Sequence, residues 1–282
     1  LKPSWLQNCL FASVVLLSFL LRMHGPILGA VEHELPDEHE LQILREMQRC
    51  LGENAKDMPD DVVGPVRLMR FLRGRLGDRA IAEAMCNAMV SWRLHEERFD
   101  VAQVRQSVVG LSLEEFQRYF AAMPERQYLP SAFLGRSRNG NVVVWYKAGM
   151  WDIEGLTDHH GEHAVLKHEV RKMEYVMWLF SDLCKKEGRV PYLFVILDLE
   201  GASMSLLRGK SRPKIMEMAK NLSAYYFDAV EVTLVINASW VFRAAYALFA
   251  PMLTERQKSK MRVFGSIESQ ADREALHATI PP

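Results

Sequence analysis

Four short apolar runs in the second half of the chain constrain its fold more than any other feature. They have strand length and are rich in β-branched residues, and they lie at residues 142–147 (VVVWYK), 192–198 (YLFVILD), 232–237 (VTLVIN) and 261–264. Helical patterns separate them, over residues 163–185, 213–226 and 240–253. Strands that are apolar without alternation are buried on both faces. The order therefore predicts an α/β fold with a mainly parallel sheet covered by helices.

The region before these runs is predicted to be helical. Over residues 66–76, apolar side chains recur at spacings of three and four beside four arginines, which is typical of an amphipathic helix. Asp78 is placed to cap a second helix. A third helix is predicted over residues 111–122, where Ser112 and Glu115 have the spacing of a capping box.

The first thirty residues differ from the rest. Residues 10–21 (LFASVVLLSFLL) form an apolar run shorter than the roughly 20 residues that a membrane-spanning helix needs. Its length fits the core of a signal peptide, with Lys2 as a thin positive start and Ala30 as a poor cleavage site. The alternative, a misassigned extension or unusual leader before a start at Met23, stays open.

Charge and cysteine content limit the possible partners and compartments. The 35 basic and 35 acidic residues cancel, yet ten acids against three basic residues over positions 31–61 leave the remainder basic. A neutral total therefore does not exclude an anionic partner. The chain contains no CxxC pair, so neither a zinc ribbon nor a disulfide framework is suggested. A reducing compartment is therefore favoured. The four cysteines are Cys9, Cys50, Cys86 and Cys184.

Catalysis, metal binding and nucleic-acid binding find little support. Ser203 and Ser205 follow a predicted strand, but the G-x-S-x-G elbow of a serine hydrolase is absent. His159 and His163 have a spacing that suits a metal on one helix face, yet Gly161 interrupts them, and a solvated loop is the better interpretation. No zinc-finger or RNA-recognition signature is present. The chain is predicted to be non-catalytic, with no metal, no cofactor and no nucleic-acid partner.

Three stretches resemble the CRAL-TRIO lipid-binding family. Residues 66–93 (VRLMRFLRGRLGDRAIAEAMCNAMVSWR) resemble its helical N-terminal segment, and residues 195–205 (VILDLEGASMS) resemble its strand that ends in Asp-x-x-Gly. Residues 225–266 (YYFDAVEVTLVINASWVFRAAYALFAPMLTERQKSKMRVFGS) are similar to its YPER...INAP...F...KPFL...K segment without a gap. The resemblance covers about residues 60–280. Members of the family include proteins that bind phosphatidylinositol, tocopherol or retinaldehyde.

The resemblance implies a domain organisation and a lipid pocket. Residues 1–30 would be a leader or extension, residues 31–125 a helical region, and residues 126–282 a lobe that holds one lipid under a mobile gate helix. Residues 240–253 (WVFRAAYALFAPML) suit that gate, because Arg243 is their one charge and they are apolar around the helix. The expected pocket and gate residues are Leu193, Val195, Trp240, Phe242, Ala245, Tyr246, Phe249 and Met252.

Members that hold phosphatidylinositol imply a headgroup site. They use a basic residue, an acid in YPER and a lysine after the gate, and the matching positions here are Arg75, Asp228 and Lys260. A guanidinium, an ammonium and a carboxylate complement a phosphodiester and the inositol hydroxyls. The chain departs from the pattern in the shorter acid, in Leu76 for a second basic residue and in Phe227 for proline. Solvated surface charges are the alternative interpretation.

The identity of the lipid stays open between two classes. Members that bind phosphatidylcholine place hydroxyls where Leu193 and Val195 stand, which leaves a phosphoinositide or an uncharged hydrophobe such as a sterol, tocopherol or retinoid. Basic clusters at residues 208–220 and 256–262 could attract an anionic membrane by roughly 1 kcal/mol per cation. The predicted function is non-catalytic lipid binding or transfer in the cytoplasm, with peripheral membrane contact. The alternative is a membrane-recruited scaffold that keeps the fold without transferring lipid.

Overall fold

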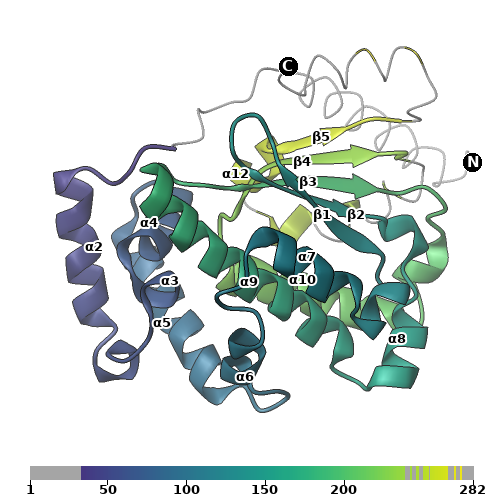
Figure 1. Ribbon diagram of the computed structural model, residues 1–282, viewed down its shortest axis with the longest axis horizontal. Coiled ribbons are helices and arrows are strands. Elements are labelled where there is room, and N and C mark those ends of the chain that lie inside the picture. The colour runs from purple at the N-terminus through teal and green to yellow at the C-terminus, as the bar shows by residue number, and fades with distance from the viewer. Residues whose placement is uncertain are drawn as a thin grey trace, which may run out of the picture.

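A five-stranded sheet covered by helices is the framework of the protein in a computed structural model (Figure 1). The structure describes residues 33–238, 242, 246, 247, 250–253, 255–265, 270 and 274. The strands follow in the order β1-β2-β3-β4-β5. They are β1 (Ser131–Arg136), β2 (Val142–Tyr146), β3 (Leu193–Asp198), β4 (Val230–Ile236) and β5 (Met261–Val263).

The helices precede and separate the strands. The α-helices are α2 (Glu38–Cys50), α3 (Asp60–Val63), α4 (Pro65–Gly74), α5 (Arg79–His95), α6 (Val101–Gln106), α7 (Leu113–Ala121), α8 (Ile153–His160), α9 (Ala164–Glu187), α10 (Ser211–Tyr225) and α12 (Glu255–Ser259). Short 3-10 turns are η1 (Glu53–Ala55), η2 (Pro124–Gln127), η3 (Ala148–Met150), η4 (Met204–Leu207) and η5 (Ala250–Met252). Within the described residues, no helix combines the length and hydropathy of a membrane-spanning segment.

The predicted α/β class and mainly parallel sheet are confirmed. β2, β3, β4 and β5 pair in parallel, and β1 pairs antiparallel with β2. The sequence pattern does not predict β1, because its residues (SAFLGR) are neither continuously apolar nor strictly alternating. A turn at Asn139 and Gly140 joins β1 to β2, and Gly140 has a φ of 74°, which glycine adopts without a steric penalty.

The predicted helix caps are confirmed, and one predicted loop is wrong. Asp78 accepts a hydrogen bond from the Ile81 amide, and Ser112 forms a capping box with Glu115. His159 lies in a helix, α8, and not in a loop. The side chain of its N-cap residue, Asp152, accepts a hydrogen bond from the Gly155 amide and stabilises the start of this helix. His163 is the N-cap of α9, so the two histidines lie on different helices and not on one helical face.

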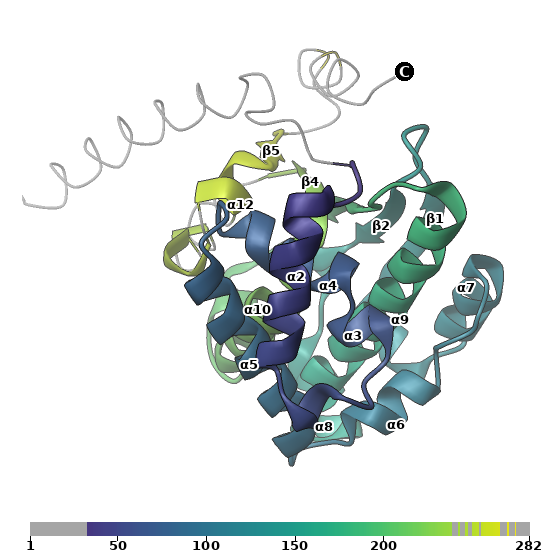
Figure 2. The same ribbon diagram turned by 90° about the vertical axis from the view of Figure 1, so that its left-hand side faces the viewer.

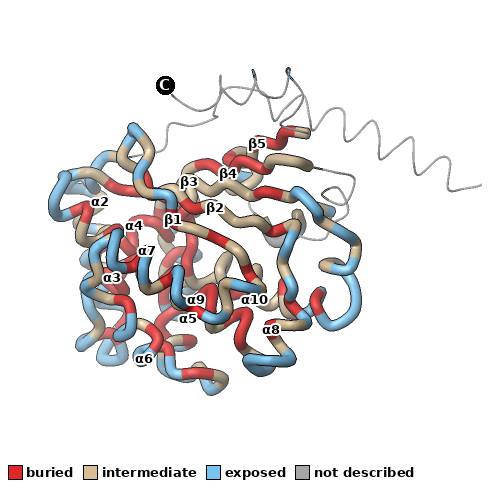
Figure 3. Tube along the Cα trace, turned by 45° about the vertical axis from the view of Figure 1, so that its right-hand side comes forward, coloured by how far each residue is buried: buried red, intermediate tan, exposed pale blue. Residues whose placement is uncertain are grey.

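The N-terminal helices pack against the sheet region through a shared core (Figure 2). Buried side chains of α2, α4 and α5 join Val190, Tyr192 and Phe227, which flank β3 and β4, in one hydrophobic cluster. α9 is buried along most of its length (Figure 3). It packs against β1, β2 and β3 through a second cluster of apolar side chains. The sheet thus has one face covered by α9 and α10.

Candidate functional site

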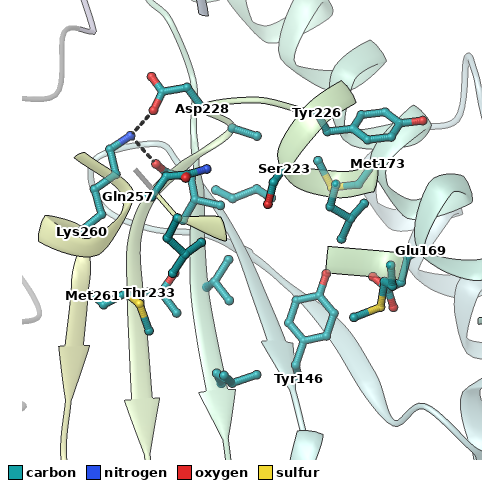
Figure 4. A pocket seen from close by; sticks show the side chains of 18 of the residues that line it. Tyr146, Glu169, Met173, Ser223, Tyr226, Asp228, Thr233, Gln257, Lys260 and Met261 are labelled. Carbon is teal, nitrogen blue, oxygen red and sulfur yellow. Dashed lines mark hydrogen bonds and ion pairs between the residues drawn. The ribbon is translucent and has the colours of Figure 1, made fainter. Parts of the chain in front are cut away.

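An apolar cavity of about 290 Å³ lies between the sheet and the helices that cover it (Figure 4). β3 contributes Leu193, Val195 and Leu197, which share one face because side chains alternate along a strand. Met173 of α9 and Met218 of α10 lie across from them on the cavity wall. The two predicted pocket residues on β3 therefore line this cavity.

A second cavity of about 260 Å³ continues the apolar space toward the predicted gate. Five residues line both cavities, namely Trp151, Leu197, Met218, Leu253 and Met261. Phe242 and Tyr246 line the second cavity. The other predicted gate residues, Trp240, Ala245 and Phe249, lie outside the described residues, as does the side chain of Met252.

One end of the first cavity carries a buried ion cluster around Asp228. Lys260 donates to Asp228 over 2.6 Å and to the Val230 carbonyl over 2.7 Å. Arg256 lies 3.3 Å from the same carboxylate. Burial lowers the pKa of Lys260, and the negative Asp228 opposes that shift. Two cations and one carboxylate leave this end of the cavity with a net positive charge.

Arg75, the third predicted headgroup residue, does not reach this cluster. Its guanidinium stacks on the Phe227 ring, 4.7 Å from the centroid, and its Nε lies 3.1 Å from the sulfur of Met85. It does not line the cavity. The structure therefore brings Asp228 and Lys260 into direct contact and places Arg75 beside Phe227, the neighbour of Asp228.

Sequence reasoning missed two residues that define the cluster. The sequence groups Arg256 with a basic patch that attracts membranes, but Arg256 lies one helical turn before Lys260, and this spacing is the signal that could pair them. Arg70 is one of the four arginines beside the apolar stripe of residues 66–76, yet it is 2% exposed and donates to the carbonyls of Asp228 and Pro191. Its guanidinium packs between two aromatic rings, those of Phe180 and Tyr192. Arg70 thus holds the backbone of the cluster in place.

The predicted basic patch over residues 256–262 is not an exposed surface. Lys260 and Arg262 are each 7% exposed, and Arg256 is held by Asp228. Lys258 is paired with Glu255. Lys260 and Arg262 are therefore buried, and Arg256 and Lys258 are held in ion pairs, where the sequence alone predicts cations that attract a membrane. The other predicted patch has four exposed cations, Arg208, Lys210, Arg212 and Lys220.

Comparison with known proteins identifies one family. The model of the CRAL/TRIO domain matches residues 126–281, more than half of the chain. A CRAL-TRIO domain-containing protein of Caenorhabditis elegans is 25% identical over 74% of this chain and 27% of its own length. The chain spans 27% to 31% of the length of this relative and of the Protein real-time relatives of two mosquitoes, Aedes aegypti and Anopheles gambiae.

Other relatives carry names that state a transfer activity or a location. A phosphatidylinositol/phosphatidylcholine transfer protein, SFH7 of Arabidopsis thaliana, is 22% identical over 79% of this chain and 40% of its own length. The SEC14 cytosolic factor of Kluyveromyces lactis is 26% identical over 81% of this chain and 70% of its own length. The crystal structure of Sfh5 aligns with a TM-score of 0.46 and 12% identity over 82% of this chain and 81% of that chain.

Proposed function

Because the chain belongs to the CRAL/TRIO domain family, we propose that it is a non-catalytic lipid carrier. One hydrophobic ligand occupies the cavity between β3 and the helices α9 and α10. The observation that carries this proposal is the apolar wall of Leu193, Val195 and Leu197, which continues into a second apolar space lined by Phe242 and Tyr246. Enclosing a ligand there removes its apolar surface from water, which stabilises the complex by roughly 0.8 kcal/mol per buried methylene.

The ion cluster favours an uncharged hydrophobe over a phosphoinositide. Asp228 already has two cationic partners, Lys260 and Arg256, so a phosphate would have to compete with a buried carboxylate for them. Arg75, which would complete the headgroup site, is not on the cavity wall. The phosphoinositide remains the second candidate, since the cluster has a net positive charge.

The proposed carrier works in the cytoplasm and contacts membranes only peripherally. Exposed cations at the start of α10 support contact with an anionic lipid surface, because each attracts such a surface by roughly 1 kcal/mol. Arg208, Lys210 and Arg212 lie within five residues. Uptake from vesicles that contain phosphatidylserine should therefore be faster than uptake from neutral vesicles.

Native mass spectrometry of the purified protein, followed by lipid extraction, tests the carrier proposal. We expect about one bound lipid per chain. Protein that is uniformly free of ligand, and that takes up no lipid from vesicles, would contradict the carrier and support the scaffold alternative.

A double substitution separates the two ligand classes. Arg75→Ala with Lys260→Ala should leave the loading of an uncharged hydrophobe unchanged. If a phosphoinositide is the ligand instead, its loading should fall about tenfold, because a charge-assisted hydrogen bond is lost. Lys258→Ala, in α12 two residues before Lys260, is the control. Equal losses for both ligands would indicate unfolding, which circular dichroism of the variant detects.

A further inference from the structure

Polar groups lie at the end of the 290 Å³ cavity that faces away from Asp228 and Lys260 (Figure 4). Glu169 of α9 and Tyr146 at the end of β2 both line the cavity there. The carboxylate of Glu169 is 2% exposed, so it is a buried charge on an otherwise apolar wall. The carrier proposal gives these groups no role.

A lysine balances the charge of Glu169. Lys172 lies three residues later on the same helix, is 1% exposed and forms an ion pair with the Glu169 carboxylate. Its Nζ lies 4.3 Å from the centroid of the Tyr146 ring. Burial lowers the pKa of Lys172, and Glu169 opposes that shift. An apolar pair of similar volume would commonly be as stable as a buried ion pair, so stability alone does not account for these residues.

Two neutral donors complete the polar end. Burial, together with the charge of Glu169 and a hydrogen bond to its carboxylate, raises the pKa of Tyr146 well above its ordinary value, so its hydroxyl stays protonated. The Trp151 ring lies 6.2 Å from the Tyr146 ring, and Trp151 lines the same cavity. Its buried indole N–H donates to no acceptor among the described residues. A buried donor without an acceptor is unfavourable, and a ligand in the cavity would supply one.

We propose that Glu169, Tyr146 and Trp151 bind the terminal hydroxyl of an otherwise apolar ligand. A hydroxyl accepts a hydrogen bond from the indole or the phenol and donates one to the carboxylate. An ester at the same place has no proton to donate, and a carboxylate or phosphate brings a second negative charge beside Glu169. The ligand class is therefore a long-chain or polycyclic alcohol. This inference rests on the proposed carrier function.

Three fluorescent polyenes that share the same hydrocarbon chain and differ only in their end group test the inference. Parinaryl alcohol, methyl parinarate and parinaric acid are titrated into lipid-free protein while their fluorescence is followed. The alcohol should bind about tenfold more tightly than the methyl ester, as one hydrogen bond to a charged group predicts. The acid should bind more weakly than the alcohol.

Variants locate the preference at the polar end. Tyr146→Phe should weaken the binding of the alcohol, because its oxygen loses the phenol donor. The double variant Glu169→Leu with Lys172→Leu removes both ions together, so that neither is left unpaired, and it should bind alcohol and ester equally. Lys186→Ala, at an exposed position of α9 outside the cavity wall, is the control and should retain the preference.

The outcomes separate this inference from the carrier proposal. Equal affinity of the wild-type protein for all three polyenes, or tightest binding of the acid, overturns the hydroxyl site and leaves the carrier standing. If the protein takes up a phosphoinositide but binds none of the three polyenes, the hydroxyl site is also overturned and the carrier proposal stands. Binding of no lipid of any kind overturns both.

Discussion

At the scale of single residues, Asp228 carries more constraints than any other position in the ion cluster. Its carboxylate is 2% exposed and faces Lys260 and Arg256. Its backbone has a φ of 51°, and Arg70 binds its carbonyl. Asparagine tolerates this left-handed conformation nearly as well as any residue except glycine. Substitution by asparagine therefore isolates the role of the charge.

Asp228→Asn should lower the free energy of unfolding by about 3 kcal/mol, because two cations lose their buried partner. Urea denaturation followed by circular dichroism measures the change. Glu255→Gln, on the exposed side of α12, should change the free energy by less than about 0.5 kcal/mol. An unchanged midpoint in Asp228→Asn would show that the cluster does not stabilise the fold.

Leu76 is a position where substitution should stabilise the protein. It is 88% exposed and has a φ of 56°, a conformation that is unfavourable for a leucine by about 1 kcal/mol. Leu76→Asn should therefore raise the free energy of unfolding by about 0.5 to 1 kcal/mol. Thermal unfolding measures it, with the exposed Leu134→Asn of β1 as a control that should gain nothing. A lower melting temperature in Leu76→Asn would show that this side chain has a packing partner.

At the scale of elements, α5, α9 and α10 meet at a buried carboxylate. Glu174 of α9 accepts two hydrogen bonds from Arg93 of α5, of 2.7 and 2.5 Å, and one of 2.5 Å from the Tyr226 hydroxyl at the end of α10. Burial alone would raise the pKa of Glu174, but Arg93 and Tyr226 outweigh it, and the pKa lies below the ordinary 4.5. Tyr226 also lines the cavity, so this junction supports the cavity wall.

Glu174→Gln should lower the free energy of unfolding by about 3 kcal/mol at pH 7. The stabilisation by Glu174 is present above its unfolded pKa of about 4.5 and is lost as the pH falls through the lower folded value. The difference between variant and wild type should therefore shrink between pH 7 and pH 3.5, as urea midpoints at both pH values will show. The exposed Glu114→Gln is the control, and a difference independent of pH would contradict the role of the charge.

A charged side chain in the wall of the second cavity should prevent the protein from retaining lipid. Phe242 lines this apolar space, and a carboxylate placed there would face no described cation across an apolar surface, which costs several kcal/mol. Phe242→Glu should therefore abolish lipid retention, measured as bound lipid by native mass spectrometry. Leu94→Glu, at an exposed position on α5, is the control. Full retention in Phe242→Glu would show that this segment does not cover the ligand.

At the scale of the whole molecule, the helical region and the sheet share their core. Arg67 and Arg70 of α4 donate to the carbonyls of Tyr225, Pro191 and Asp228, far along the chain. Burial lowers the pKa of Arg67 to about 10. The family model covers residues 126–281, but the packing crosses its boundary.

Residues 126–282 alone should therefore fail to fold. Without α2 to α5, the buried side chains of Val190, Tyr192 and Phe227 lose the hydrophobic cluster that covers them, and exposed apolar patches of this kind lead to aggregation. Size-exclusion chromatography and thermal unfolding of the fragment, compared with residues 33–282, will measure this. A monomeric fragment with a cooperative transition would show that the lobe is autonomous.

The sequence by itself determined the features that depend on neighbours along the chain. Continuous apolar runs predicted β2 to β5, and helical patterns predicted α4, α5, α7, α9 and α10 but not α2, α3, α6, α8 or α12. The caps at Asp78 and Ser112 followed from local hydrogen-bonding chemistry. The resemblance pointed to Leu193 and Val195 as pocket residues, and both line the first cavity, on one face of β3 because side chains alternate along a strand.

Only the tertiary structure decided which charges are buried and what they contact. β1 becomes a strand through its pairing with β2, and Asp228 meets Lys260 across 32 positions and Arg70 across 158. The ion pair of Glu169 and Lys172 has a spacing that is common on solvated helices, and the sheet packed against α9 is what buries it. The physical reason is that local sequence sets backbone conformation, whereas desolvation and charge pairing depend on segments that are distant along the chain.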